Sequence, residues 1–115
     1  MQWRWKLAFV YLDPVVGIEQ AGNRPILVVS DETFNEVMNV VTVLPLTRRK
    51  QRRNVYQNEV LLPEDESGLP YESIIMAHQI RTISKSRLKR DIGYITSTDI
   101  QQACLRAMQI HLGMY

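Results

Sequence analysis

Short apolar runs, separated by proline, glycine and charged residues, make up most of the first two thirds of the chain. The clearest of them are rich in β-branched side chains and leucine and cover residues 7–12, 25–30, 40–44 and 73–80. Runs of this length with turn residues between them predict strands buried in a sheet. A weaker pattern predicts an edge strand within 55–62. A sixth strand is expected between Leu88 and Ile95, where Gly93 weakens the pattern.

Proline is expected to mark two of the strand ends, because a residue without an N–H cannot donate to a ladder. Pro14 follows the first run and Pro45 closes the third. The segment 15–23 contains two glycines and predicts a loop long enough to fold over a site. A short helical turn is expected at 33–36, capped by the serine or aspartate just before it.

Helical periodicity is found only near the C-terminus. Side chains there follow the spacing of one buried helix face, formed by Ile100, Ala103, Cys104, Ala107, Met108 and His111. Ser97 or Thr98 can cap this helix, and Asp99 suits its first turn. Cys104 is expected to be a small buried residue, and His111 a packed or interface residue rather than a ligand.

Many short strands followed by one substantial helix predict a mainly β chain with a C-terminal helix, in the α+β class. The expected architecture is a small antiparallel barrel or half-barrel whose helix covers one opening. A doubly wound fold is not expected, because it needs helices alternating with the strands. With 115 residues the chain has room for one hydrophobic core, so residues 1–115 are expected to form a single domain.

The composition limits the kinds of site and of cellular location that are expected for this chain. The single cysteine allows no internal disulfide, and the two histidines lie far apart in sequence, so structural zinc is not expected. No stretch approaches the ~20 apolar residues that span a bilayer, and the N-terminus lacks the apolar core of a signal peptide, so a cytoplasmic protein is expected. The net charge of +2 gives no general argument for a nucleic-acid partner.

Positive charge is nonetheless concentrated in one place. Residues 48–53 hold five basic side chains in six positions, and an acidic turn at 64–66 compensates them. A run of this kind is usually a solvated loop. It becomes relevant to function only if it lies beside a site.

The second strand begins with a residue suited to binding phosphate. Pro25 disfavours helical backbone at Arg24 and holds this arginine extended at the mouth of a buried strand. A planar guanidinium with a permanent charge on a stiff base suits a phosphate. The alternative is an ion pair with a carboxylate elsewhere in the fold.

Three polar side chains are expected on strands, or at strand ends, of one small barrel: Arg24, Thr47 and His78. RNA can be cut without a metal when its own 2′-hydroxyl attacks the adjacent phosphate, which requires a base, charge stabilisation and an acid. Arg24 offers charge, Thr47 a hydrogen bond to a phosphate oxygen, and His78 a proton-exchanging imidazole. Any barrel of this size could show three such residues, so this pattern alone assigns no function.

A longer motif turns the pattern into a family resemblance. Residues 13–30, DPVVGIEQAGNRPILVVS, resemble the signature of the MazF/PemK (Kid) family of toxin endoribonucleases of type II toxin–antitoxin systems. Three shorter blocks recur at the expected intervals: Phe34-Asn35, Pro45-Leu46-Thr47 and Gln79-Ile80-Arg81-Thr82-Ile83. The resemblance extends from about Phe9 to the final helix.

This resemblance implies an SH3-like barrel of the CcdB/MazF type, a homodimer, and cleavage of single-stranded RNA, often mRNA, without a metal or other cofactor. Such cleavage leaves a 2′,3′-cyclic phosphate and a 5′-hydroxyl. A MazE-like antitoxin, whose disordered tail lies across the RNA groove, is also implied. Arg24 matches the catalytic arginine of the family, and Thr47 the threonine that contacts the scissile phosphate in some members. The expected RNA-binding residues are Glu19, Gln20, Asn23, Arg48, Arg49, Lys50 and Gln79.

Other positions depart from the family pattern. Ile18 stands where some relatives have a histidine, and Met76 and His78 stand where some have an arginine and an aspartate. The acid–base apparatus of that subgroup therefore does not transfer. His78 is a candidate catalytic residue, either as a base near neutral pH or as a neutral hydrogen-bond partner of the loop. The segment 4–6 replaces the usual turn before the first strand, which bears on the start of that strand or the adjacent dimer surface.

Two alternatives stay open from the sequence. A toxin on the same fold could act by binding a protein, as the gyrase poison CcdB does through its C-terminal residues, here 113–115. A barrel that binds RNA without cutting it is the other alternative, because the acid–base positions are unmatched.

Overall fold

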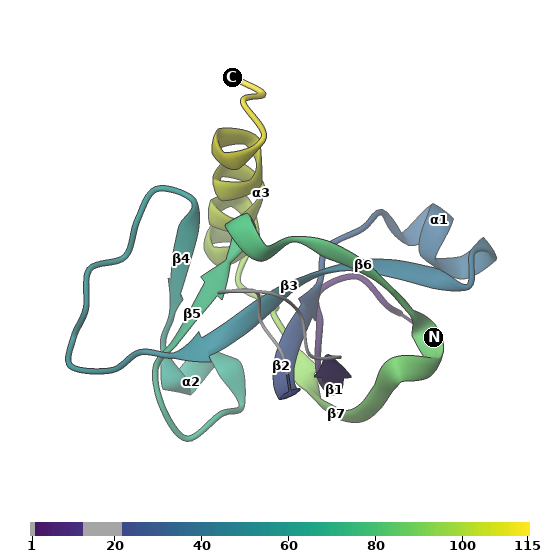
Figure 1. Ribbon diagram of the computed structural model, residues 1–115, viewed down its shortest axis with the longest axis horizontal. Helices are drawn as coiled ribbons and strands as arrows, with labels where there is room; N and C mark the ends of the chain where they lie inside the picture. The colour runs from purple at the N-terminus through teal and green to yellow at the C-terminus, as the bar shows by residue number, and fades with distance from the viewer. Residues whose placement is uncertain (1, 13–21) are drawn as a thin grey trace.

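The computed structural model describes residues 2–12 and 22–115. Its elements are β1 (Lys6–Leu12), β2 (Gly22–Val28), α1 (Glu32–Val37), β3 (Val40–Arg48), β4 (Glu59–Leu62), α2 (Glu64–Ser67), β5 (Ser73–Met76), the 3₁₀ turn η1 (Ala77–Gln79), β6 (Arg81–Ser84), the 3₁₀ turn η2 (Lys85–Arg87), β7 (Leu88–Tyr94) and α3 (Thr98–His111). The strands form an antiparallel sheet in the order β4-β5-β3-β2-β1-β7, and β6 also pairs with β3. Figure 1 shows the sheet curling into a small barrel, with α3 standing over β4 and β5. The predicted class, a mainly β barrel with a C-terminal helix, is confirmed.

The central strand is β3, and it continues past the proline predicted to close it. β2 pairs along one edge, with Ile26 opposite Pro45, whereas the other edge is shared by β6 at 40–43 and β5 at 46–48. Pro45 lies in the gap between β6 and β5, so its missing N–H breaks no ladder bond on that edge. The predicted strand end at Pro45 is therefore wrong, and Thr47 belongs to the strand.

The run 73–80, predicted to be one strand, is interrupted by a turn. Leu46 of β3 pairs with Ile75, and Val43 of β3 pairs with Arg81. Two residues of β3 separate these pairs, whereas five residues separate them on the opposing chain, and the extra residues form η1. A surplus of this kind bulges out of a ladder and redirects its side chains. The sequence pattern missed both this turn and β6, because the apolar run continues across the break.

β2 begins at Gly22 rather than at Pro25, and its first residues already pair with β1. Gly22 has a φ of +80°, a conformation that glycine adopts without steric cost. The predicted strand end at Pro14 and most of the predicted loop at 15–23 lie outside the described residues.

Two groups of buried side chains fill the fold. One lies between the sheet and α3 and includes Leu27, Leu46 and Cys104; the other fills the barrel and includes Ile26 and Val43. Alternate residues of a strand face opposite sides. Even-numbered residues of β2 and odd-numbered residues of β3 therefore share the face that lines the barrel.

The C-terminal helix forms as predicted. The Ser97 side chain accepts the N–H of Ile100 at 3.3 Å, and the buried side of the helix carries Ile100, Cys104 and Ala107. Burial raises the pKa of the Cys104 thiol to about 12, consistent with a packed, unreactive side chain. His111, expected to be packed or at an interface, is exposed in the isolated chain. None of the helices in the described ranges is long and apolar enough to span a bilayer.

The unusual N-terminal segment sets the start of β1. Trp5 is buried at a φ of +70°; its N–H donates to the Val28 carbonyl at 2.8 Å, and its carbonyl accepts the N–H of Ile95 at 2.8 Å. The next residue, Lys6, is only 3% exposed and places its ammonium 5.1 Å from the Trp3 ring. The two tryptophans thus anchor this end of the chain to the sheet.

Candidate functional site

Arg24 and Thr47 lie on neighbouring strands and face the same side of the sheet. Arg24 is a residue within β2, not a residue at the mouth of the strand as predicted. β2 and β3 pair through Ile26 and Pro45, and side chains two positions along a strand share a face. Arg24 and Thr47 are both half-buried. We call this pair the strand site.

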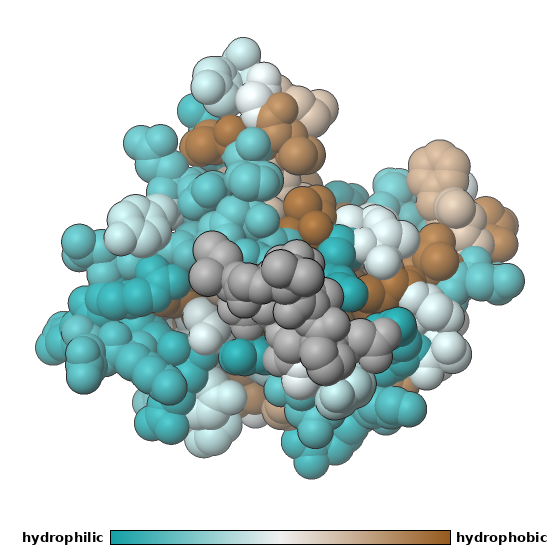
Figure 2. Space-filling view, viewed as in Figure 1, coloured by the Kyte–Doolittle hydropathy of each residue, from teal (hydrophilic) through white to brown (hydrophobic). Residues whose placement is uncertain are grey.

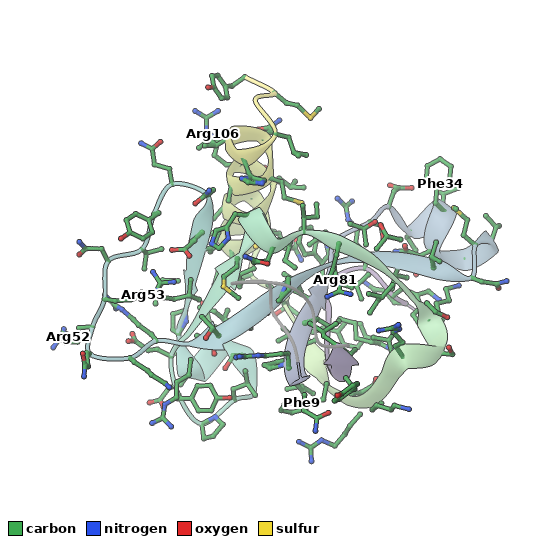
Figure 3. The ribbon with its side chains drawn as sticks, in the orientation of Figure 1. Phe9, Phe34, Arg52, Arg53, Arg81 and Arg106 are labelled. Carbon is green, nitrogen blue, oxygen red and sulfur yellow. The ribbon has the colours of Figure 1, made fainter. Side chains whose placement is uncertain are left out.

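Arg81 adds a further cation to that face. It opens β6 opposite Val43 of β3, which shares its face with Thr47. Figure 3 shows the Arg81 side chain among the strands at the centre of the molecule. No hydrogen bond or ion pair joins this half-buried guanidinium to any residue within 2–12 or 22–115. Arg81 is part of a sequence motif but was not predicted as a site residue.

The predicted basic run begins at the end of β3, and its first two arginines pack against the chain. The Arg48 guanidinium lies 4.9 Å from the centre of the Tyr71 ring. Arg49 donates from Nε to the carbonyl of Arg53 at 3.1 Å and from Nη1 to Glu72 Oε1 at 3.4 Å. These contacts hold the base of the loop.

The outer part of the loop, around residues 50–52, is open to solvent. Lys50 and Arg52 are exposed, and Gln51 and Arg52 have positive φ values of 54° and 51°, as in a tight turn. Figure 3 shows Arg52 at the outer edge of the loop, and Figure 2 shows hydrophilic residues over this side of the molecule. Lys50 and Arg52, together with the exposed Arg48 at the base of the loop, are therefore the cations of the run that a ligand could reach directly.

Arg53, the last arginine of the run, binds a buried carboxylate. Glu59 begins β4, and its side chain is only 3% exposed. Arg53 donates from Nη1 to Oε1 at 3.0 Å and from Nη2 to Oε2 at 2.9 Å, the Tyr56 N–H donates to Oε1 at 3.1 Å, and His78 Nε2 lies 2.8 Å from Oε2. Burial alone would raise the pKa of Glu59, but the hydrogen bonds from Arg53, His78 and Tyr56 outweigh it and lower the pKa to about 2. We call Glu59, Arg53 and His78 the Glu59 cluster.

His78 lies on the η1 turn and not on a strand as predicted. The bulge carries its ring to the Glu59 carboxylate, and its side chain is 27% exposed. On the other side, the His78 and His111 rings meet edge to face with centroids 6.3 Å apart. His78 is thus held between an edge strand and the end of α3.

The Glu59 cluster and the strand site share one face of the sheet. Glu59 pairs with Met76 of β5, and Thr47 pairs with Ile74, two residues earlier on the same strand. Ladder geometry then places the Cα atoms of Thr47 and Glu59 roughly 12 Å apart. This face therefore combines permanent cations, a hydroxyl and an imidazole, which suits an extended anionic ligand.

The remaining predicted residues are only partly placed. Asn23 is exposed on β2, and Gln79 is half-buried on η1 beside His78. Glu19 and Gln20 lie outside the described residues. Within 2–12 and 22–115, no group of three histidine, cysteine or acidic side chains is arranged to hold a metal ion.

Known proteins resemble this chain in sequence and in fold. The family described as "PemK-like, MazF-like toxin of type II toxin-antitoxin system" matches residues 4–112. The chain is 31% identical over 104 residues to the endoribonuclease MazF of Staphylococcus saprophyticus, across 90% of this chain and 85% of that protein. The crystal structure of MazF from Deinococcus radiodurans superposes with a TM-score of 0.77 at 27% identity, covering 96% of each chain. A mycobacterial endoribonuclease in complex with its cognate antitoxin shares the fold, with a TM-score of 0.78 at 20% identity over 100% of this chain and 98% of that one.

Proposed function

The chain belongs to the PemK-like, MazF-like family of toxins of type II toxin–antitoxin systems, and we propose that it is an endoribonuclease that cuts single-stranded RNA, such as mRNA, without a metal ion. The observation that carries this proposal is the common face of Arg24 and Thr47 on two paired strands. A guanidinium and a hydroxyl held by strands are suited to one phosphate group.

In the proposed reaction, the 2′-oxygen of one nucleotide bonds to the adjacent phosphorus and loses its proton to a base. The bond from phosphorus to the 5′-oxygen breaks, and that oxygen takes up a proton. The products are a 2′,3′-cyclic phosphate and a 5′-hydroxyl. Arg24 offsets the negative charge that develops on the phosphorane, and Thr47 donates a hydrogen bond to a phosphate oxygen. Arg24 is not assigned the role of the base, because a guanidinium does not give up a proton in proteins.

The RNA strand is proposed to run along the face that joins the strand site to the Glu59 cluster. Lys50 and Arg52 are exposed on the loop that leads from β3 to Arg53 of the Glu59 cluster, and Arg48 and Arg49 lie at the base of this loop. We assign these cations to the RNA backbone, since phosphate contacts supply most of the affinity for single strands. The residues proposed to contact bases are Glu19, Gln20, Asn23 and Gln79.

A homodimer and a MazE-like antitoxin are the proposed protein partners. The antitoxin proposal is supported by the mycobacterial relative, whose structure was determined with its cognate antitoxin. A small protein encoded beside this chain should copurify with it and block cleavage when added in equal amount.

Cleavage of a defined RNA tests the proposal. Purified protein, incubated with a mixed pool of long single-stranded RNAs in EDTA, should produce discrete fragments whose 5′ ends accept phosphate from a polynucleotide kinase without prior dephosphorylation. Arg24→Ala should leave the RNA intact. RNA that is shifted in a gel but never cut would indicate a binding protein. Toxicity that depends on residues 113–115 and not on Arg24 would indicate a gyrase-type poison.

A further inference from the structure

Glu59 is the one buried carboxylate among the described residues, and the catalytic roles proposed above do not use it directly. It lies on β4, at the end of the sheet, where a polar side chain could have remained in water. A buried charge costs free energy unless hydrogen bonds compensate it. The four donors around Glu59 provide that compensation, and one of them is the imidazole of His78.

The contacts of Glu59 determine which nitrogen of His78 carries a proton. The guanidinium of Arg53 and the N–H of Tyr56 keep Glu59 ionised, so the carboxylate can only accept a hydrogen bond from the imidazole. His78 Nε2, 2.8 Å from Oε2, must then be the donor. The other nitrogen, Nδ1, is left as the atom that gains or loses a proton. Glu59 itself is unsuited to be the base, because its acceptor positions are already occupied.

We propose that Glu59 is a positioning residue for RNA cleavage: its carboxylate holds the proton of His78 on Nε2 and orients the ring so that Nδ1 exchanges protons with the substrate. This inference rests on the proposed function, since it assumes that His78 moves the protons that Arg24 and Thr47 cannot move. Arg53 supports the arrangement by fixing the carboxylate from the opposite side with two hydrogen bonds.

The other groups around His78 are consistent with this role. From α3 the exposed His111 ring approaches edge-on, with its Nδ1 3.4 Å from the amide nitrogen of Asn58. From β4 and the loop before it come the Glu59 carboxylate and, behind it, the Arg53 guanidinium. The carboxylate is thus the only charged side chain in direct hydrogen-bond contact with the His78 ring within 2–12 and 22–115.

Two variants test the role of Glu59. Glu59→Gln keeps the size of the side chain but replaces an obligatory acceptor by an amide, which can also donate to Nε2 and so release the fixed tautomer. Glu72→Gln is the matched control, because Glu72 binds Arg49 of the same loop and does not contact His78. The measurements are kcat and KM for a short RNA containing the mapped cleavage sequence, and the ¹⁵N chemical shifts of the His78 ring, which distinguish the two tautomers.

In the Glu59→Gln variant we expect kcat to fall by about tenfold or more, with a smaller change in KM, and the His78 ¹⁵N signals to lose the pattern of a proton fixed on Nε2. Glu72→Gln should keep kcat within about twofold of the wild type, as expected for an exposed ion pair. If Glu59→Gln does not fold, His78→Gln replaces it: the amide still donates to Glu59, so the fold is kept, and kcat should fall while KM changes little.

The outcomes separate the two proposals. A wild-type protein that leaves every RNA intact overturns the proposed function itself. A wild type that cleaves, together with a folded Glu59→Gln variant of unchanged kcat or an unchanged His78 tautomer, overturns only the role of Glu59. Unchanged kcat in a folded His78→Gln variant has the same consequence.

Discussion

The strand site and the Glu59 cluster lie on one face of the sheet, but they are held in place by different means. Arg24 and Thr47 project from paired strands whose buried neighbours fix the backbone. Glu59, Arg53 and His78 come from an edge strand, a loop and a 3₁₀ turn, and charged hydrogen bonds hold them to one another. Loss of a strand-site side chain should therefore change the chemistry more than the stability of the fold. Loss of Glu59 or of Arg53 from the Glu59 cluster should also lower the stability of the fold.

Substitution of Arg24 is expected to have the largest effect on the rate of RNA cleavage, and a much smaller one on the stability of the fold. Arg24→Ala should lower the rate of RNA cleavage by about 10³-fold, because a permanent charge no longer offsets the developing phosphorane charge. Arg24→Lys keeps the charge but not the planar pair of donors, so it should retain part of the rate. Single-turnover cleavage and thermal unfolding are the measurements. Activity of the alanine variant within tenfold of the wild type would remove Arg24 from the catalytic role.

The Glu59 cluster should instead be visible in the acid stability of the fold. The pKa of Glu59 is lowered from 4.5 to about 2, so its contribution is fully present above pH 4.5 and is lost as the pH falls through about 2. Each pKa unit corresponds to about 1.4 kcal/mol, which makes this contribution roughly 3 kcal/mol. Urea unfolding at pH values from 7 down to 2 should show the loss in the wild type. The free energy of unfolding of Glu59→Gln should start lower at pH 7 and depend less on acid; equal acid dependence in both proteins would contradict this account.

Thr47 tests whether the strand site needs its hydroxyl or only its shape. Thr47→Val keeps the β-branched side chain that suits β3, so the stability should change little. Cleavage should slow by about tenfold to 100-fold, because one hydrogen bond to the phosphate is missing in the transition state. Thr47→Ser is the control that keeps the hydroxyl, and it should recover most of the rate. Equal rates for the valine and serine variants would mean that Thr47 contributes packing alone.

The same difference explains what the sequence could predict. Arg24 and Thr47 were recognisable because each lies close to a proline and an apolar strand, patterns that are local in the sequence. The Glu59 cluster was not recognisable as a unit, because Arg53 and His78 lie 6 and 19 residues from Glu59 and no local sequence pattern links the three residues. The η1 turn that brings His78 to Glu59 depends on how β5 and β6 share one edge of β3, and register over such a separation is a tertiary property.

The smallest expected effect comes from the exposed loop cations, and it divides the basic run in two. Replacing Lys50 and Arg52 together by glutamine should raise KM for RNA several-fold. The slope of log Kd against log salt should also become shallower by roughly 1.4, because each phosphate of a single strand that is no longer neutralised contributes about 0.7. The free energy of unfolding should be unchanged, because within 2–12 and 22–115 neither side chain has a hydrogen-bond or ion-pair partner.

Arg53→Gln, three residues from Lys50, is expected to have the opposite effect. It should lower the free energy of unfolding, because it leaves the buried Glu59 carboxylate without its bidentate partner. If the double variant and Arg53→Gln behaved alike in salt dependence and in unfolding, the basic run would act as one solvated loop. There would then be no distinction between cations that bind RNA and a cation that supports the fold.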